Sequence, residues 1–154
     1  MRTLNLISDV ELLGPWAWKL MGAGVWFSEG KSALGALNDD GSPRWACVYD
    51  HYERDGSIQM HIAIDNPKYV TRQAISACFE YPFLQLGVRK VLGIVNSNNG
   101  SALTFDLRLG FELEAVVEDA YDRGDMYILS MTHEQCRWLR GNHYGWSSDS
   151  TAAA

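Results

Sequence analysis

Three short segments in the first half of the chain, residues 32–37, 44–51 and 57–65, are predicted to be β-strands. In the third, apolar and polar residues alternate with the two-residue period of a strand. In the third segment four large aliphatic side chains fall on one face, and His61 falls on the other. Short stretches rich in Asn, Asp and Gly separate the segments, as β-turns require. We therefore predict an antiparallel meander of three strands.

The spacing of the apolar residues changes to three or four after residue 70. Residues 71–86 have the spacing of a helix that packs on a sheet, with Pro82 as a kink or the start of its last turn. Ahead of the meander, the pattern predicts a strand at 3–8 and a helix at 9–21 that Gly14-Pro15 interrupts. After the long helix it predicts a strand at 88–95, a helix at 101–109, strands at 111–119 and 125–131, and a brief helix at 133–140.

A helix that joins two strands of one sheet leaves those strands parallel. The predicted fold class is therefore α/β, with a mixed and mostly antiparallel sheet in which segments 57–65 and 88–95 form one parallel pair. If these two strands splay at one end, a cleft for an extended ligand opens between them. Functional residues are expected along this cleft.

Length and charge limit the classes of function. The 154 residues fit one domain, which we place at 1–144, followed by a flexible tail at 145–154. No apolar run has the length of a membrane helix and no signal-peptide pattern opens the chain, so we expect a cytoplasmic protein with no membrane partner. The formal charge of −6 argues against a general affinity for nucleic acid, although a local basic patch stays open. Three separated cysteines predict reduced, buried thiols and no metal site.

Three motifs occur at matched intervals in the second half of the chain. They are the segment Gly87–Val95, the helix start Asn99-x-x-Ala102, and the joint Arg108-Leu109-Gly110-Phe111. In this arrangement the chain resembles the GNAT superfamily of N-acetyltransferases, and within it the divergent GNAT-like proteins of phages and prophages. The resemblance covers about residues 32–140. It implies the acyl-CoA N-acyltransferase fold, with acetyl-CoA or another acyl-CoA bound in the cleft.

The segment before the long helix departs from the family, whose glycine-rich loop binds the CoA pyrophosphate. Residues 65–73 contain no glycine. Backbone N–H groups at the helix start, with nearby cations and a hydroxyl, are a substitute for that loop. The residues of this substitute are Lys68, Val70, Thr71, Arg72 and Gln73. In the alternative interpretation Thr71 only caps the helix and the two cations are solvated.

The resemblance also implies contacts for the pantetheine arm and the thioester. Asn99, beside Ala102, either caps the short helix or hydrogen-bonds the arm. A strand N–H near Ile62 or Ile64 would polarise the thioester carbonyl.

The general acid is a second departure from the family. Many members have a tyrosine seven residues after the asparagine, and here that position is Asp106. An aspartate protonates a thiolate only where burial raises its pKa. We expect instead that Asp106 lies on the exposed face of the helix, with Ser101 or a water as the acid.

The candidate general bases are His61 and Asp65, at the end of the third meander strand. A lone histidine on a strand is more often structural. Glu29 and Asp119 are further candidates from the acceptor side. Together with Trp26, Tyr121 and Tyr127 they would flank the acceptor groove, where carboxylates favour an amine.

The leading hypothesis is an N-acetyltransferase that acts on a primary amine by direct transfer within a ternary complex. The acceptor is a small amine, a protein amine or an aminoacyl-tRNA. One alternative is a GNAT scaffold without catalysis that serves protein interaction, and another is a phage-type enzyme that modifies nucleic acid. A homodimer through sheet edges or terminal helices, with Trp138 and Trp146, is also among the expectations.

Overall fold

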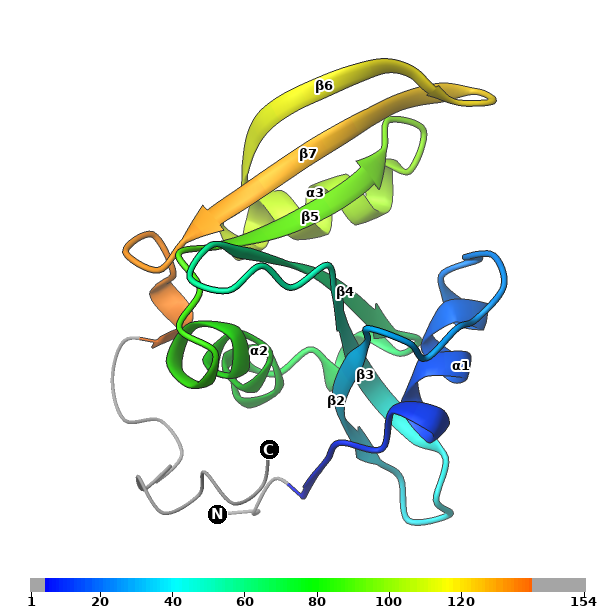
Figure 1. Ribbon diagram of the computed structural model, residues 1–154. Helices are drawn as coiled ribbons and strands as arrows, with labels where there is room; N and C mark the ends of the chain where they lie inside the picture. The colour runs from blue at the N-terminus through cyan, green and yellow to red at the C-terminus, as the bar shows by residue number, and fades with distance from the viewer. Residues whose placement is uncertain (1–4, 140–154) are drawn as a thin grey trace.

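The computed structural model describes residues 5–139, and a seven-stranded sheet forms its centre (Figure 1). The strand order is β1-β2-β3-β4-β5-β7-β6. All neighbouring pairs are antiparallel except β4 and β5, which are parallel. This confirms the predicted mixed α/β sheet with one parallel pair. The strands are β1 (Leu6–Ile7), β2 (Ser32–Leu37), β3 (Pro43–Asp50), β4 (Ser57–Ile64), β5 (Lys90–Asn96), β6 (Glu112–Tyr121) and β7 (Gly124–Thr132).

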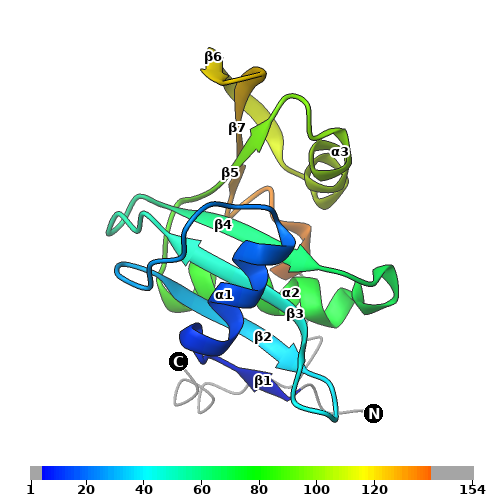
Figure 2. The same cartoon turned by 90° about the vertical axis from the view of Figure 1, so that its right-hand side faces the viewer.

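Three helices cover the two faces of this sheet. They are α1 (Val10–Leu20), α2 (Arg72–Glu80) and α3 (Gly100–Leu109). Figure 2 shows α1 on one face of the sheet and α2 on the other. The buried face of α1 forms its own apolar cluster with β3 and β4, whereas α2 and α3 share the larger core on the opposite face. Within residues 5–139, no helix has the length and apolar character needed to cross a membrane.

Each helix begins at a residue whose side chain caps it. Asp9, Thr71 and Asn99 each accept a hydrogen bond from a backbone N–H in the first turn. The predicted interruption of the first helix is wrong, because α1 continues through Pro15. Proline removes one backbone donor there, and the burial of Leu13 and Ala17 against the sheet offsets this loss.

Pro82 changes the helix type at the end of α2. The α-helix stops at Glu80 and a π-helical turn, η2 (Tyr81–Gln85), follows it. Because Pro82 has no N–H, it cannot bond the carbonyl of Cys78 four residues earlier. The hydroxyl of Tyr49 on β3 donates to that carbonyl instead, at 2.5 Å. The predicted kink is thus also a link between the helix and the sheet.

Elsewhere the predicted ranges need small corrections. The boundaries of β2 to β7 lie within two residues of the prediction. Of the helix expected at 133–140, a 3-10 turn, η3 (Arg137–Leu139), is what forms within the described residues. Ahead of it, reciprocal bonds between Thr132 and Gln135 form a capping box, but the helical turn that it starts does not continue into a regular helix. The three cysteines are buried, as predicted, and each carries a thiol outside any disulfide. The predicted tail at 145–154 and Trp146 lie outside the described residues.

Candidate active site

The two parallel strands separate partway along their length. β4 and β5 pair only from Ser57 to Gln59 and from Lys90 to Leu92, although β4 continues to Ile64 and β5 to Asn96. Beyond Gln59 and Leu92 the two strands no longer form a ladder. The predicted splay is therefore present, at the carboxyl ends of both strands. The backbone polar groups along the facing edges are left for another partner.

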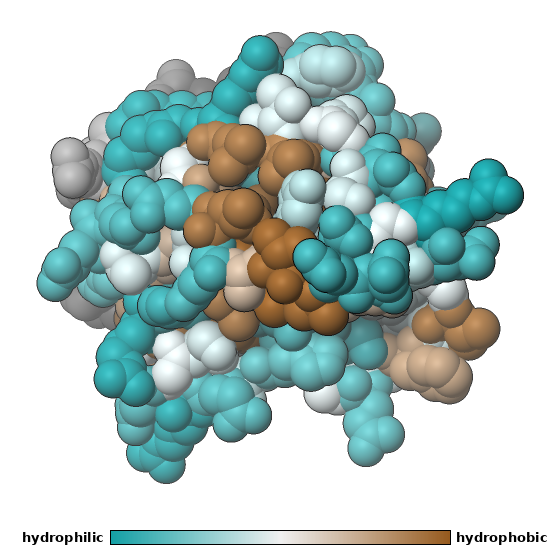
Figure 3. Space-filling model, turned by 90° about the horizontal axis from the view of Figure 1, so that it is seen from above, coloured by the Kyte–Doolittle hydropathy of each residue, from teal (hydrophilic) through white to brown (hydrophobic). Residues whose placement is uncertain are grey.

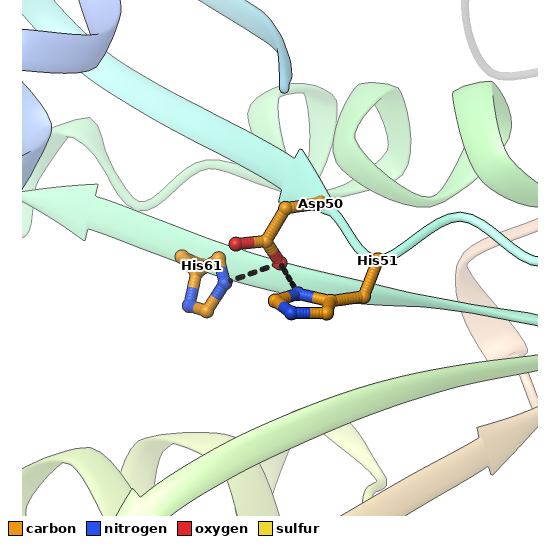
Figure 4. A network of polar contacts seen from close by, with 3 residues as sticks. All are labelled: Asp50, His51 and His61. Atoms are coloured by element: carbon orange, nitrogen blue, oxygen red, sulfur yellow. Dashed lines mark hydrogen bonds and ion pairs between the residues drawn. The ribbon is translucent and has the colours of Figure 1, made fainter. Parts of the chain in front are cut away.

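His61 lies just past the last paired residue of β4, and Asp50 at the end of β3 holds its ring (Figure 4). Its Nε2–H donates to Oδ1 of Asp50 at 2.9 Å. A carboxylate only accepts, so this bond places the proton of the neutral imidazole on Nε2 and leaves Nδ1 as the basic nitrogen. Figure 4 shows that nitrogen on the side of the ring away from Asp50. His61 therefore has the tautomer of a general base.

A second histidine shares the same carboxylate oxygen. Nδ1 of His51, a largely exposed residue, lies 3.2 Å from Oδ1 of Asp50. Burial alone raises the pKa of Asp50, but the hydrogen bonds and charges of His61 and His51 outweigh it and hold the pKa below its ordinary value. Asp50 therefore stays ionised and can stabilise a proton on His61.

Asp106 lies on the other side of the separation between the strands. Its Oδ2 is 3.4 Å from the position where Gly93 would carry a Cβ, so the absent side chain of Gly93 makes room for the carboxyl. Gly93 follows Leu92, the last paired residue of β5. Burial raises the pKa of Asp106 to about 6, against a smaller opposing effect of the His61 charge. The exposed position that we expected for Asp106 is wrong.

The two candidate groups thus approach the separation from opposite faces of the sheet. His61 lies on the α1 face, where its ring contacts Trp18 of α1. Asp106 belongs to α3, whose apolar side chains join the core on the α2 face. A ligand between the diverging strands would therefore meet a base from one face and an acid from the other.

Two tryptophans form an aromatic corner beside His61. The rings of Trp18 and Trp26 meet edge to face at 5.0 Å, and the Trp18 ring is 5.3 Å from that of His61. Trp26 comes from the loop after α1 and turns inward, while its neighbours Val25 and Phe27 are exposed. We call this pair the Trp18–Trp26 corner.

Gly14 holds the Trp26 ring in place. A Cβ at Gly14 would lie 2.1 Å from two atoms of that ring, so only glycine lets the indole rest on the α1 backbone. We expect Gly14→Ala to displace Trp26 and to lower the free energy of unfolding by about 1–3 kcal/mol. Urea unfolding measures this loss. The matched variant Gly24→Ala has open space around its new methyl group and should be nearly neutral. Equal stability of both variants would contradict the contact.

A pocket of about 850 Å³ adjoins the start of α2, and Lys68, Thr71 and Gln73 line it together with Arg44 and Tyr69. The two cations Lys68 and Arg44 each lie 5.1 Å from the centre of the Tyr69 ring. The pocket is polar, with two cations and one carboxylate, Asp39, in its lining, and it lies at a helix N-terminus, which suits an anionic group.

Not all of the predicted phosphate donors are available. The N–H groups of Val70 and Thr71 donate to carbonyls within the 3-10 turn η1 (Pro67–Tyr69) and its exit. Arg72 and Gln73 lie in the first turn of α2, and the guanidinium of Arg72 lies 5.8 Å from the centre of the Trp138 ring. Thr71 caps the helix through its hydroxyl, as the alternative interpretation had it, and it also lines the pocket.

Other predicted residues lie apart from the pair formed by His61 and Asp106. Asp65 is exposed beyond the end of β4. Asn99 accepts from Ala102 as a cap, and the Ser101 hydroxyl donates to Asn99. Ile62 and Ile64 lie in the part of β4 that pairs with β3 but not with β5. Both are half-buried and pack against the larger core.

The predicted acceptor residues divide into two groups. Trp26 and the exposed Glu29 lie on the loop after α1, whereas Asp119, Tyr121 and Tyr127 lie on the β6–β7 arm. Asp119 lies at an irregularity of β6 near the end of that arm, with a left-handed backbone and an N–H that donates to Asp125. Among the described residues, no hydrogen bond or ring contact joins the two groups. Trp26 is the member linked to His61 by ring contacts, through Trp18.

Sequence reasoning missed Asp50, His51, Arg44 and Tyr69. Asp50 could have been predicted from the pairing of the two strands. The β3–β4 register places Val48 opposite His61, and Asp50 lies diagonal to His61 on the same face. The contact of Trp18 with His61 carries no local signal, since it depends on how α1 crosses the sheet.

The sequence matches no protein-family model and no curated protein. The structure, in contrast, resembles solved N-acetyltransferases. A mutant form of the spermidine/spermine N-acetyltransferase SpeG from Vibrio cholerae aligns with a TM-score of 0.69 at 15% identity, over 86% of this chain and 96% of that one. A second SpeG mutant aligns with a TM-score of 0.68 at 14% identity, over 90% and 97%.

A third solved protein, described as a candidate phosphinothricin N-acetyltransferase, aligns with a TM-score of 0.62 at 17% identity, over 84% of this chain and 98% of that one. At such identities the likeness concerns the fold. It agrees with the strand order and with the single parallel pair that separates at its carboxyl ends. The chain therefore has the fold of the GNAT N-acetyltransferases.

Proposed function

We propose that this chain is an acetyl-CoA-dependent N-acetyltransferase that transfers the acetyl group directly to a primary amine, with both substrates bound at once. The observation that carries the proposal is the placement of His61 and Asp106 on opposite faces of the sheet, at the point where β4 and β5 separate. A base and an acid on either side of an extended slot suit a reaction in which one partner loses a proton and the other gains one.

In this mechanism acetyl-CoA supplies an activated acetyl thioester. Nδ1 of His61 takes the proton of the acceptor ammonium, and the ion pair with Asp50 stabilises the imidazolium. The amine nitrogen forms a bond to the acetyl carbon as the carbon–sulfur bond breaks. Asp106 donates its proton to the departing sulfur, and a pKa of about 6 keeps a fraction of this carboxyl protonated near neutral pH. The acetylated nitrogen then releases its second proton, which restores the Asp106 carboxyl, and His61 returns its own proton to solvent.

The pocket at the start of α2 fits the phosphate end of the cofactor. Lys68 and Arg44 would contribute positive charge, and the N–H groups of Arg72 and Gln73 would point along the helix axis toward an anion. These features replace the missing glycines. Asn99 and Ala102 at the start of α3 are the proposed neighbours of the pantetheine arm.

Binding of the cofactor can be measured apart from transfer. We expect Lys68→Ala combined with Arg44→Ala to weaken CoA binding about tenfold or more, because these are the two cations that line the proposed phosphate pocket. Isothermal calorimetry with CoA measures the change. Arg54→Ala, in the exposed turn before β4, removes a charge far from α2 and should leave the affinity unchanged. Unaltered affinity in the double variant would place the phosphates elsewhere.

Transfer itself is tested with acetyl-CoA and a set of aliphatic amines, by following free thiol and identifying the acetylated amine by mass spectrometry. The SpeG proteins are named for spermidine and spermine, so polyamines belong in the set. Formation of an acetylamine supports the proposal. Stabilisation by CoA of about 2.7 kcal/mol at 100 times its Kd, with no product from any amine, would favour the non-catalytic scaffold.

We further propose that two copies associate through β6. This strand is the edge of the sheet, and Figure 3 shows apolar surface gathered over the β6–β7 arm. Leu113, Val116 and Val117 are between 45% and 53% exposed there. An open edge with apolar side chains is a ready pairing surface. Sedimentation should give a dimer for the native chain and a monomer for Val117→Lys; a monomeric native chain would overturn the proposal.

A further inference from the structure

Lys31 places its ammonium group over the Trp18–Trp26 corner. Its Nζ lies 5.7 Å from the centre of each of the two rings. Among the described residues no carboxylate forms an ion pair with Lys31. Among the aromatic side chains tryptophan attracts cations most strongly, so the two indoles are the groups that hold this charge.

The corner is built to keep its shape. Gly14 fixes the Trp26 ring against the backbone of α1, and Trp18 extends from the same helix. Lys31, in contrast, comes from a half-exposed position just before β2 and reaches the corner with a flexible side chain. The rings are therefore the fixed part of the arrangement, and the lysine is the part that another cation can replace.

The corner also adjoins the proposed base, since Trp18 contacts both Trp26 and His61. A cation held by aromatic faces keeps its proton, because the attraction depends on the positive charge. The nitrogen that reacts must lose its proton at His61. The ammonium in the corner is therefore a second nitrogen of the acceptor and not the one that is acetylated.

We propose that the Trp18–Trp26 corner binds a non-reacting ammonium group of the acceptor, and that Lys31 occupies this site until the acceptor displaces it. This proposal rests on the proposed function and specifies which acceptor binds beside His61. The substrate class it names is an aliphatic diamine or polyamine. One nitrogen lies in the corner, and a second, a short chain away, reaches Nδ1 of His61.

The experiment uses a cation that cannot be acetylated. Tetramethylammonium is titrated into the ¹⁵N-labelled protein, and the indole N–H signals of Trp18 and Trp26 are followed by NMR, with Trp18→Phe and Trp26→Phe for assignment. We expect these two signals to shift, and 2-methylpropan-2-ol, a neutral molecule of similar shape, to shift neither. The result does not depend on transfer, so a chain that fails to acetylate amines can still bind the cation.

Lys31→Met removes the competing charge and keeps the length of the side chain. We expect it to lower the Kd for tetramethylammonium about threefold to sixfold, the factor by which a cation–π contact at a half-exposed site favours the bound lysine. Lys19→Met, an exposed lysine on α1, should leave the Kd unchanged. With native protein, 1,4-diaminobutane should bind at least about threefold more tightly than 1-aminobutane, because its second charge adds Coulomb attraction to the carboxylates. Unmoved indole signals, an unchanged Kd in Lys31→Met, or equal binding of the two amines would overturn the proposal.

Discussion

Replacing His61 by glutamine is expected to lower kcat for acetyl transfer by about 10²- to 10⁴-fold, the usual contribution of a general base. Glutamine keeps an N–H that can donate to Asp50, so the contact at the end of β3 survives and the fold should too. It has no basic nitrogen to replace Nδ1. Steady-state kinetics over a range of pH measure the loss, and circular dichroism checks that the variant is folded.

Two neighbouring variants sharpen this prediction. His51→Gln removes the other histidine bonded to Asp50, but His51 is largely exposed, and we expect kcat to change only a fewfold. Asp50→Asn keeps an oxygen that can accept from His61 and removes the charge that stabilises the imidazolium, so it should give an intermediate loss. If His61→Gln retained native kcat while Asp50→Asn lost activity, the base would be another group.

Local patterns were sufficient to predict the elements that form the fold. The two-residue alternation around His61 and the change of period after residue 70 specify strands and a crossover helix, and a crossover helix requires a parallel pair. The separation of β4 and β5 was a further expectation, which a parallel pair alone does not require. Pro15 was predicted to interrupt the first helix, but α1 continues through it. Burial of Leu13 and Ala17 against the sheet outweighs the backbone hydrogen bond that proline removes.

The site was predictable only in part, because its contacts join distant segments. His61 and Asp106 were both candidates from their positions on a strand and after Asn99, yet nothing local showed that Gly93 would leave space for the Asp106 carboxyl. The exposure of a helix residue depends on which face the sheet covers. Trp18 and the pocket residue Arg44 depend likewise on the packing of separate elements.

Asp106→Asn is expected to stabilise the fold and to impair transfer at the same time. The folded pKa of about 6 lies above the ordinary value of 3.8, so between those values the folded state binds more protons than the unfolded state, and stability falls as pH rises. A shift of about two units corresponds to about 3 kcal/mol lost by pH 7 and above. Asparagine avoids this loss. The variant should therefore match the native chain below pH 4 and exceed it by roughly 6–12 °C in Tm at pH 8.

Measurement of kcat distinguishes a catalytic acid from a buried carboxyl group that only destabilises the fold. Glu80, at the far end of α2, also has a pKa that burial raises, to about 7. Glu80→Gln should gain stability at pH 8 without changing kcat, because Glu80 is remote from the separating strands. Asp106→Asn should gain stability and lose about 10²-fold or more in kcat, since its amide cannot give a proton to the departing sulfur. Higher stability together with a lower kcat is the result expected when a buried acid that destabilises the fold is needed for catalysis. If Asp106→Asn were stabilised with full activity, Asp106 would be a buried carboxyl with no part in the reaction.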